Sequence, residues 1–76
     1  MFKMFIGIDI SKDWVDIHLN TKFYKVLQSN VESFISNHKH EFQEALCIME
    51  STGGYEINLA RHLMDQGIAV HIAHPN

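Results

Sequence analysis

The chain has 76 residues and a formal net charge of −3, and its composition is 46% hydrophobic and 20% charged. These values exclude a disordered or coiled-coil chain and predict one small globular domain. The single cysteine excludes an internal disulfide framework and predicts a reducing, cytoplasmic location. The acidic balance argues against a free-standing nucleic-acid binder, because such domains are usually basic.

Apolar stretches of the length that a membrane span needs do not occur in the sequence. The longest runs, 4–8 and 45–49, have about five residues, whereas a span needs about 20. Asp9 interrupts the first run before the core of a signal peptide is complete. We therefore expect no membrane segment in this chain.

The first third of the chain predicts three strands in a meander. Residues 4–10 are apolar on both alternating faces up to Asp9, which predicts a central strand covered on both sides. Residues 14–19 alternate between apolar and polar side chains, and the tight turn before them predicts an antiparallel hairpin with the first strand. A third strand is expected over 23–27. The inward-facing side chains of the second strand are Val15, Ile17 and Leu19.

From Ser29 the period of the apolar residues changes to that of a helix. Ser29 and Glu32 have the spacing of a capping box, and the residues after them predict a helix to about residue 40. Residues 45–49 are an apolar run that ends at Glu50. This run predicts a second strand that is buried on both faces.

The last third predicts a helix followed by a strand. Residues 51–54 form a turn that precedes a helix over 55–66, and Gly67 is well placed to stop that helix. A final strand is expected over 68–73, closed by Pro75. The apolar stripe predicted for the helix consists of Ile57, Ala60, Leu63 and Met64.

The order of these elements is β-β-β-α-β-α-β. A helix between two strands implies parallel pairing through a right-handed crossover. We therefore predict an α/β fold with a mixed five-stranded sheet, in which an antiparallel hairpin side joins parallel strands and helices pack on the faces of the sheet. Residues 1–76 are expected to form one domain, because no linker or repeat divides them.

Two carboxylates fall at the carboxyl ends of predicted parallel strands, where α/β sheets bind their ligands: Asp9 near the end of the first strand and Glu50 at the end of the fourth. If these strands are neighbours, about 4.8 Å apart, the two carboxylates repel each other unless a divalent cation lies between them. Hard oxygen ligands favour Mg²⁺ or Mn²⁺, which serve in phosphoryl transfer. The alternative is that each acid only ends a strand and is solvated.

Two motifs resemble a known family. The segment Gly-Ile-Asp-Ile-Ser-Lys at 7–12, with the antiparallel strand after it, resembles the opening of an RNase H-like, RuvC-type nuclease core. The segment Met-Glu-Ser-Thr-Gly-Gly-Tyr at 49–55, followed by a helix, a strand and a closing Pro-Asn, resembles the DEDD transposases of the IS one-ten family (Piv/MooV-like recombinases). The resemblance covers essentially the whole chain.

The resemblance implies a DNA transposase or recombinase that cuts and rejoins DNA, with Asp9 and Glu50 as two of four acidic ligands of Mg²⁺ or Mn²⁺. In the family the other two ligands lie on a helix after the last strand, and this sequence ends at Asn76 without that helix. The chain is then expected to be the N-terminal, incomplete part of the RNase H-like domain and to lack nuclease activity by itself. DNA and a guide RNA would be partners of the full-length protein.

Lys12 and Thr52 are candidates for contact with a phosphate or with DNA. Lys12 lies next to the predicted metal site, and Thr52 precedes glycine amides at a predicted helix N-terminus. The plainer interpretations are a solvated turn lysine and a helix cap.

Two other function classes remain open. Sugar kinases and actin-like ATPases also begin with Gly-Ile-Asp, but their first hairpin turn needs glycines, and residues 11–13 contain none. The third class is a non-catalytic interaction module in which both acids are structural. The missing helix also predicts an uncovered apolar sheet face, and hence weak self-association into a homo-oligomer.

Overall fold

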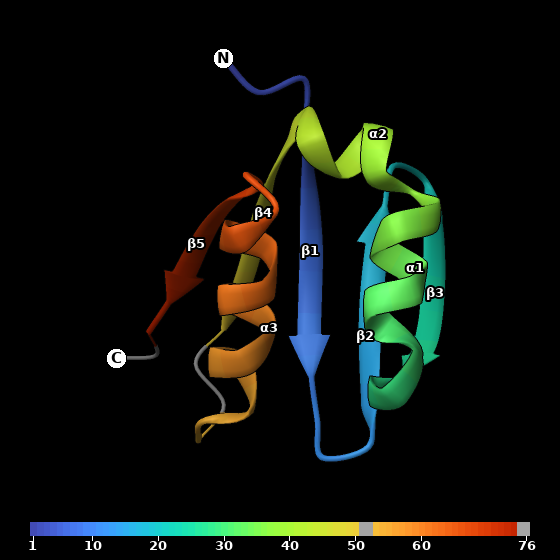
Figure 1. The fold of residues 1–76 in the computed structure, drawn as a ribbon, viewed down its shortest axis with the longest axis vertical. Coiled ribbons are helices and arrows are strands. Elements are labelled where there is room, and N and C mark those ends of the chain that lie inside the picture. Colours follow the sequence, from blue (N-terminus) through green and yellow to red (C-terminus); the bar gives the residue numbers. More distant parts are fainter. Residues whose placement is uncertain (51–52, 75–76) are drawn as a thin grey trace.

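Five strands form one mixed sheet in the computed structural model, which describes residues 1–50 and 53–74 (Figure 1). The order across the sheet is β3-β2-β1-β4-β5, with β1 antiparallel to β2 and parallel to β4. The predicted α/β class and the mixed pairing are therefore confirmed. The strands are β1 (Met4–Ile10), β2 (Trp14–Leu19), β3 (Lys22–Leu27), β4 (Ala45–Glu50) and β5 (Ala69–Ala73).

The first two strands begin and end where the alternation of apolar residues predicts, and β3 begins at Lys22, one residue earlier than expected. The β2–β3 hairpin is tight because Asn20 adopts a left-handed conformation with a φ of 58°, which asparagine tolerates better than most residues. The predicted inward side of β2 is buried. The sequence pattern was therefore sufficient for the bounds of β1 and β2 and for the inward side of β2.

The expected helix up to residue 40 is divided into three pieces: the 3₁₀ turn η1 (Gln28–Asn30), α1 (Val31–Asn37) and α2 (Lys39–Gln43). The capping-box prediction was wrong. Ser29 lies inside η1, and the N-cap of α1 is Asn30, which makes no side-chain capping hydrogen bond. The reason is that the chain leaves β3 directly into the 3₁₀ turn, so Ser29 is already past the extended residue that a cap requires.

All helices of the described residues pack on one face of the sheet (Figure 1), so the prediction of helices on both faces was wrong. The connections β3 to β4 and β4 to β5 run in the same direction across the sheet. Because right-handed crossovers in one direction place their helices on one side, α1, α2 and α3 (Tyr55–Asp65) share a layer.

The other sheet face, which we call the open face, is exposed in the described part of the chain. The predicted double-sided burial of β1 and β4 was therefore wrong. In β1, Ile6 and Ile8 are buried, whereas Phe5 between two inward residues is 63% exposed. In β4, Cys47 is buried, whereas Leu46 and Ile48, which point to the other face, are only half-buried. An uncovered sheet face was expected, but the exposed side chains on it include the carboxylates Asp9 and Glu50 as well as apolar Phe5.

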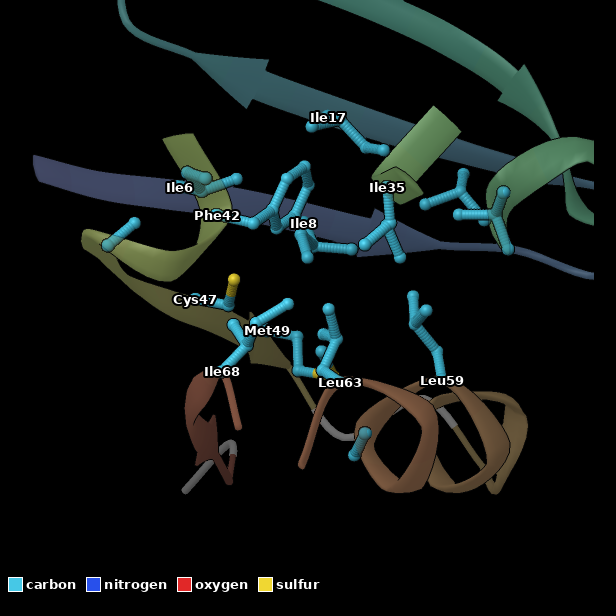
Figure 2. Packing of buried hydrophobic residues seen from close by; sticks show 14 of the residues in the cluster. Ile6, Ile8, Ile17, Ile35, Phe42, Cys47, Met49, Leu59, Leu63 and Ile68 are labelled. Carbon is cyan, nitrogen blue, oxygen red and sulfur yellow. The ribbon is translucent and has the colours of Figure 1, made fainter. Parts of the chain in front are cut away.

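The hydrophobic core lies between the sheet and the helix layer (Figure 2). Ile6, Ile8 and Ile17 of the sheet meet Phe42 and Ile35 of the helices there. The buried hydrophobic side chains are Ile6, Ile8, Ile10, Val15, Ile17, Leu19, Val31, Ile35, Phe42, Ala45, Cys47, Met49, Leu59, Ala60, Leu63 and Ile68.

The predicted apolar stripe of α3 was half right. Ala60 and Leu63 are buried, but Ile57 and Met64 are 53% and 57% exposed, and Leu59 takes their place in the core. Each residue turns the helix by about 100°, so a core face centred on 59, 60 and 63 leaves 57 and 64 on the flank.

The predicted stop of α3 at Gly67 is confirmed. Gly67 has a φ of +77°, its N–H donates to the carbonyl of Met64 at 3.0 Å, and the N–H of Ile68 donates to the carbonyl of Leu63 at 3.0 Å. This pair of bonds is a Schellman motif, and the buried Leu63 and Ile68 supply its apolar contact. The turn directs the chain from α3 into β5.

Candidate acidic site on the open face

Asp9 and Glu50 lie side by side at the carboxyl ends of two adjacent parallel strands. The β1–β4 register pairs Ile8 with Met49, so the next residues of the two strands are Asp9 and Glu50. Ile8 and Met49 point into the core, and successive side chains of a strand alternate, so both acids project from the open face. Both residues are exposed.

A third carboxylate, Asp16, joins this pair. Asp16 is the antiparallel register partner of Asp9 and is half-buried on the same face. Only Asp9 and Glu50 were predicted as acidic ligands from the sequence. The alternation of β2 together with the tight hairpin register was the signal that places Asp16 opposite Asp9. We call Asp16, Asp9 and Glu50, on β2, β1 and β4, the acid row.

A lysine side chain lies next to the acid row on the neighbouring strand, β3. Lys25 of β3 is the register partner of Asp16, but its ammonium lies 5.0 Å from the centre of the Trp14 ring. Like charges directly opposite each other on paired strands are generally destabilising, so we expect removal of one charge from the Asp9–Asp16 pair to stabilise the sheet.

The acid row borders a shallow hollow of about 390 Å³ in the open face. Its floor is low because Gly7, between Phe5 and Asp9 on this side of β1, has no side chain. At one side the rings of His18 and Phe23 lie 5.3 Å apart. The hollow is lined by Gly7, Ile8, Asp9, Asp16, His18, Phe23, Ile48, Met49 and Glu50.

The acid row does not form a closed metal centre. Among residues 1–50 and 53–74, no group of three or more His, Cys, Asp or Glu side chains is placed to hold a metal ion. The donors themselves are carboxylate oxygens, which suit Mg²⁺ or Mn²⁺. A divalent ion at Asp9 and Glu50 would therefore need further ligands to complete its coordination sphere.

The two candidates for phosphate contact are not brought to this hollow. Lys12 lies in the β1–β2 turn, where its carbonyl accepts a hydrogen bond from the Gln28 side chain at 2.9 Å, and it is absent from the lining of the hollow. Thr52 lies outside the described residues, as do Ser51 and Pro75.

At the N-terminus of α3, one backbone amide already donates a hydrogen bond to a side chain of the same helix. Gly54, the N-cap of α3, donates its N–H to the carboxylate of Glu56 at 3.1 Å. Glu56 is 6% exposed. This contact favours the turn-forming interpretation of the glycines over anion binding.

No protein-family model and no curated protein sequence matches this chain. None of the helices in the described part of the chain is long and apolar enough to cross a membrane.

Proposed function

We propose that this chain is the N-terminal part of the RNase H-like catalytic domain of a DEDD transposase or recombinase similar to the IS one-ten family. The observation that carries the proposal is the placement of Asp9 and Glu50 beside each other on the open face. The mixed five-stranded sheet and the order β-β-β-α-β-α-β, with α1 and α2 counted as one helical connection, support this proposal.

Asp9 and Glu50 would hold Mg²⁺ or Mn²⁺ together with two acids from elsewhere in the full-length protein. A divalent ion bound there supplies charge stabilisation at a phosphodiester that is being cut or joined. The strands hold both carboxylates on rigid backbone, which is the positioning that such chemistry needs. Asp16 adds negative charge next to Asp9 and so raises the attraction of the site for a cation.

Under this proposal, an acidic chain can still serve a DNA-processing protein. Without a cation, the acid row repels a phosphate backbone, so contact with DNA at this face depends on divalent metal. Strand cutting would require the full-length protein, whose remaining parts supply the missing ligands and the surfaces for DNA and guide RNA.

The test is a Mn²⁺ titration of the chain, followed by paramagnetic broadening of backbone amide signals. We expect broadening centred on residues 8–10 and 49–50 at about millimolar metal, because two carboxylates alone bind weakly. Asp9→Asn and Glu50→Gln should each remove most of it. Asp65→Asn, which neutralises a carboxylate at the end of α3, is the matched control and should leave it unchanged.

Broadening that is uniform over the surface, or that persists in Asp9→Asn, would contradict the proposal and leave the interaction-module alternative. The nucleotide-binding alternative has less support, because residues 11–13 of the hairpin turn contain no glycine that would let a phosphate approach the backbone closely. A parallel titration with Mg-nucleotide separates that class from the transposase.

A further inference from the structure

The edge strand β5 has an unprotected outer side. In the described residues β5 pairs with β4 only and forms one end of the sheet. Its sequence, Ala-Val-His-Ile-Ala, contains no Asp, Glu, Lys, Arg or Pro. Charged residues and proline are the devices that usually keep sheet edges from pairing, and the opposite edge β3 carries Lys22 and Lys25. The β5 edge is therefore the side of the sheet that is open to a further strand.

Exposed apolar side chains of α3 lie above this edge. Ile57 and Met64 are seven positions apart and so lie on one side of the helix. His62 faces α1, because its Nδ1 lies 3.7 Å from the carboxylate of Glu32 on that helix. Around the axis of α3, His62 is about 140–160° away from both Ile57 and Met64. Ile57 and Met64 therefore point away from α1, towards the side of the sheet where Figure 1 shows β5.

Two side chains of β5 extend this apolar surface. Val70 and Ile72 pair in register with Cys47 and Met49, which point into the core, so they lie on the helix side of the sheet. Both are only half-buried, at the outer margin of the core. We call Ile57, Met64, Val70 and Ile72 the edge strip.

We propose that β5 pairs antiparallel with β5 of a second copy of this chain, about a twofold axis at His71, so that the two sheets become one continuous sheet. In this register His71 lies opposite His71 of the partner subunit, and Val70 lies opposite Ile72 of the partner subunit. A twofold axis makes the contact self-complementary. The edge strips of both copies then meet on the helix side and cover each other.

Charge favours the β5 edge over the open face as the contact between copies. Two open faces stacked about an axis along the strands bring Asp9 of one copy towards Asp9 of the partner subunit. If the twofold axis instead runs perpendicular to the strands, the acid row of one copy lies opposite Phe5 and Leu46 of the partner subunit. Either arrangement buries unpaired carboxylates, which is costly. The β5 edge brings no formally charged side chain of its strand together.

The contact is small. A five-residue strand pair with a few side chains falls below about 1,200 Å² of total buried area, the class of weak and transient interfaces. The experiment therefore measures the mass of the 76-residue chain by sedimentation equilibrium up to about 1 mM, where weak association is still visible. A mixture of ¹³C-labelled and unlabelled chain then reports methyl contacts between copies by isotope-filtered NOE.

Two disruptive variants and one control are compared. His71→Lys places like charges opposite each other at the axis, and Met64→Glu puts a charge into the edge strip; both side chains are exposed, so the fold tolerates them. Phe5→Lys makes a similar change on the open face, where the side chain is 63% exposed. Unchanged amide shifts in β1 and β4 verify that each variant is folded.

We expect a dimer in the unchanged chain, contacts between Val70 and Ile72 of different copies, at least tenfold weaker association in His71→Lys and Met64→Glu, and little change in Phe5→Lys. A chain that stays monomeric to about 1 mM overturns the proposal. The proposal is also overturned if Phe5→Lys abolishes association and His71→Lys does not, because the copies then contact each other through the open face.

Discussion

Asp16 shows how one residue can alter the chemistry of a site without being prominent in the sequence. It is one polar position in an alternating strand, and its importance follows from the antiparallel register that sets it opposite Asp9. Lys25, its partner on the other side, has its ammonium above Trp14. Asp9 and Asp16 are therefore a like-charged register pair, and we expect their repulsion to be relieved by a bound cation or by removing one charge.

Asp16→Asn is expected to raise the free energy of unfolding by roughly 0.2–1 kcal/mol in metal-free buffer, because it removes a like-charge pair across two strands. Urea denaturation with and without 10 mM EDTA measures the change. Asp13→Asn, in the exposed turn beside β2, is the control and should change stability by less than about 0.5 kcal/mol. Equal effects of the two variants would mean that only net charge matters.

The buried thiol of Cys47 makes stability depend on alkaline pH. Burial raises the pKa of this thiol from 9.0 to about 12, so the folded chain holds the proton over a range in which the unfolded chain releases it. This stabilisation is complete below pH 9 and is lost as the pH rises towards 12. We expect the free energy of unfolding to fall by about 1 kcal/mol between pH 9 and pH 10 from this group.

The measurement is urea unfolding at both pH values, compared with Cys47→Ala. The variant is less stable at every pH because it leaves a cavity in the core, but it lacks this thiol and so should lose the corresponding part of the pH dependence. An identical pH dependence in both chains would show that other groups cause it.

At the scale of the elements, the sequence pattern predicted the bounds of β1 and β2, but not the one-sided burial of β1 and β4 or the start of α1. β1 and β2 have their predicted bounds because alternation and short turns are local properties. The prediction of a capping box at Ser29 was wrong because the end of β3 at Leu27 determines where the helical segment begins. The stripe of α3 was misassigned at Ile57 because tertiary packing, which a single helix does not encode, selects which of two adjacent stripes faces the core.

The Schellman turn at the end of α3 provides a test at this scale. Gly67→Ala is expected to cost about 1–2 kcal/mol, because an L-residue is disfavoured at a φ of +77°. No heavy atom lies within 4 Å of a Cβ built at Gly67, so the loss is conformational and not steric.

Gly7→Ala is the matched control. A Cβ at Gly7 would lie 3.7 Å from the Cβ of His18, an ordinary contact, and alanine suits a strand interior better than glycine does. Thermal unfolding should therefore show a lower Tm for Gly67→Ala and an unchanged or slightly higher Tm for Gly7→Ala. Similar losses in both would indicate a role of Gly7 that its surroundings do not show.

At the scale of the whole molecule, the mixed sheet followed from the order of the elements, whereas the location of the helix layer did not. Which face the helices cover depends on the direction of each crossover, and this direction requires the strand order β3-β2-β1-β4-β5. The same order brings Asp9 and Glu50 together. Their proximity was predictable on the condition that β1 and β4 are neighbours, and the structure meets that condition.

The proposed function makes a prediction for the full-length protein. Asp9→Ala should abolish DNA strand cleavage while the fold stays intact, because the side chain is exposed at the end of β1 and packs in no core. A cleavage assay with supercoiled DNA, together with circular dichroism, measures both properties. Cleavage at the unchanged rate would refute the assigned role of Asp9.

The central position of β1 has a consequence for the order in which the molecule folds. β1, β2 and β3 are joined by tight turns and can pair soon after they meet, whereas Met4 pairs with Ala45, about forty positions later in the chain. The slow step is then the closure of this long loop, which brings β4 to β1. Variants in the β1–β4 pair should mainly slow refolding, and variants in β5, which adds afterwards, should mainly speed unfolding.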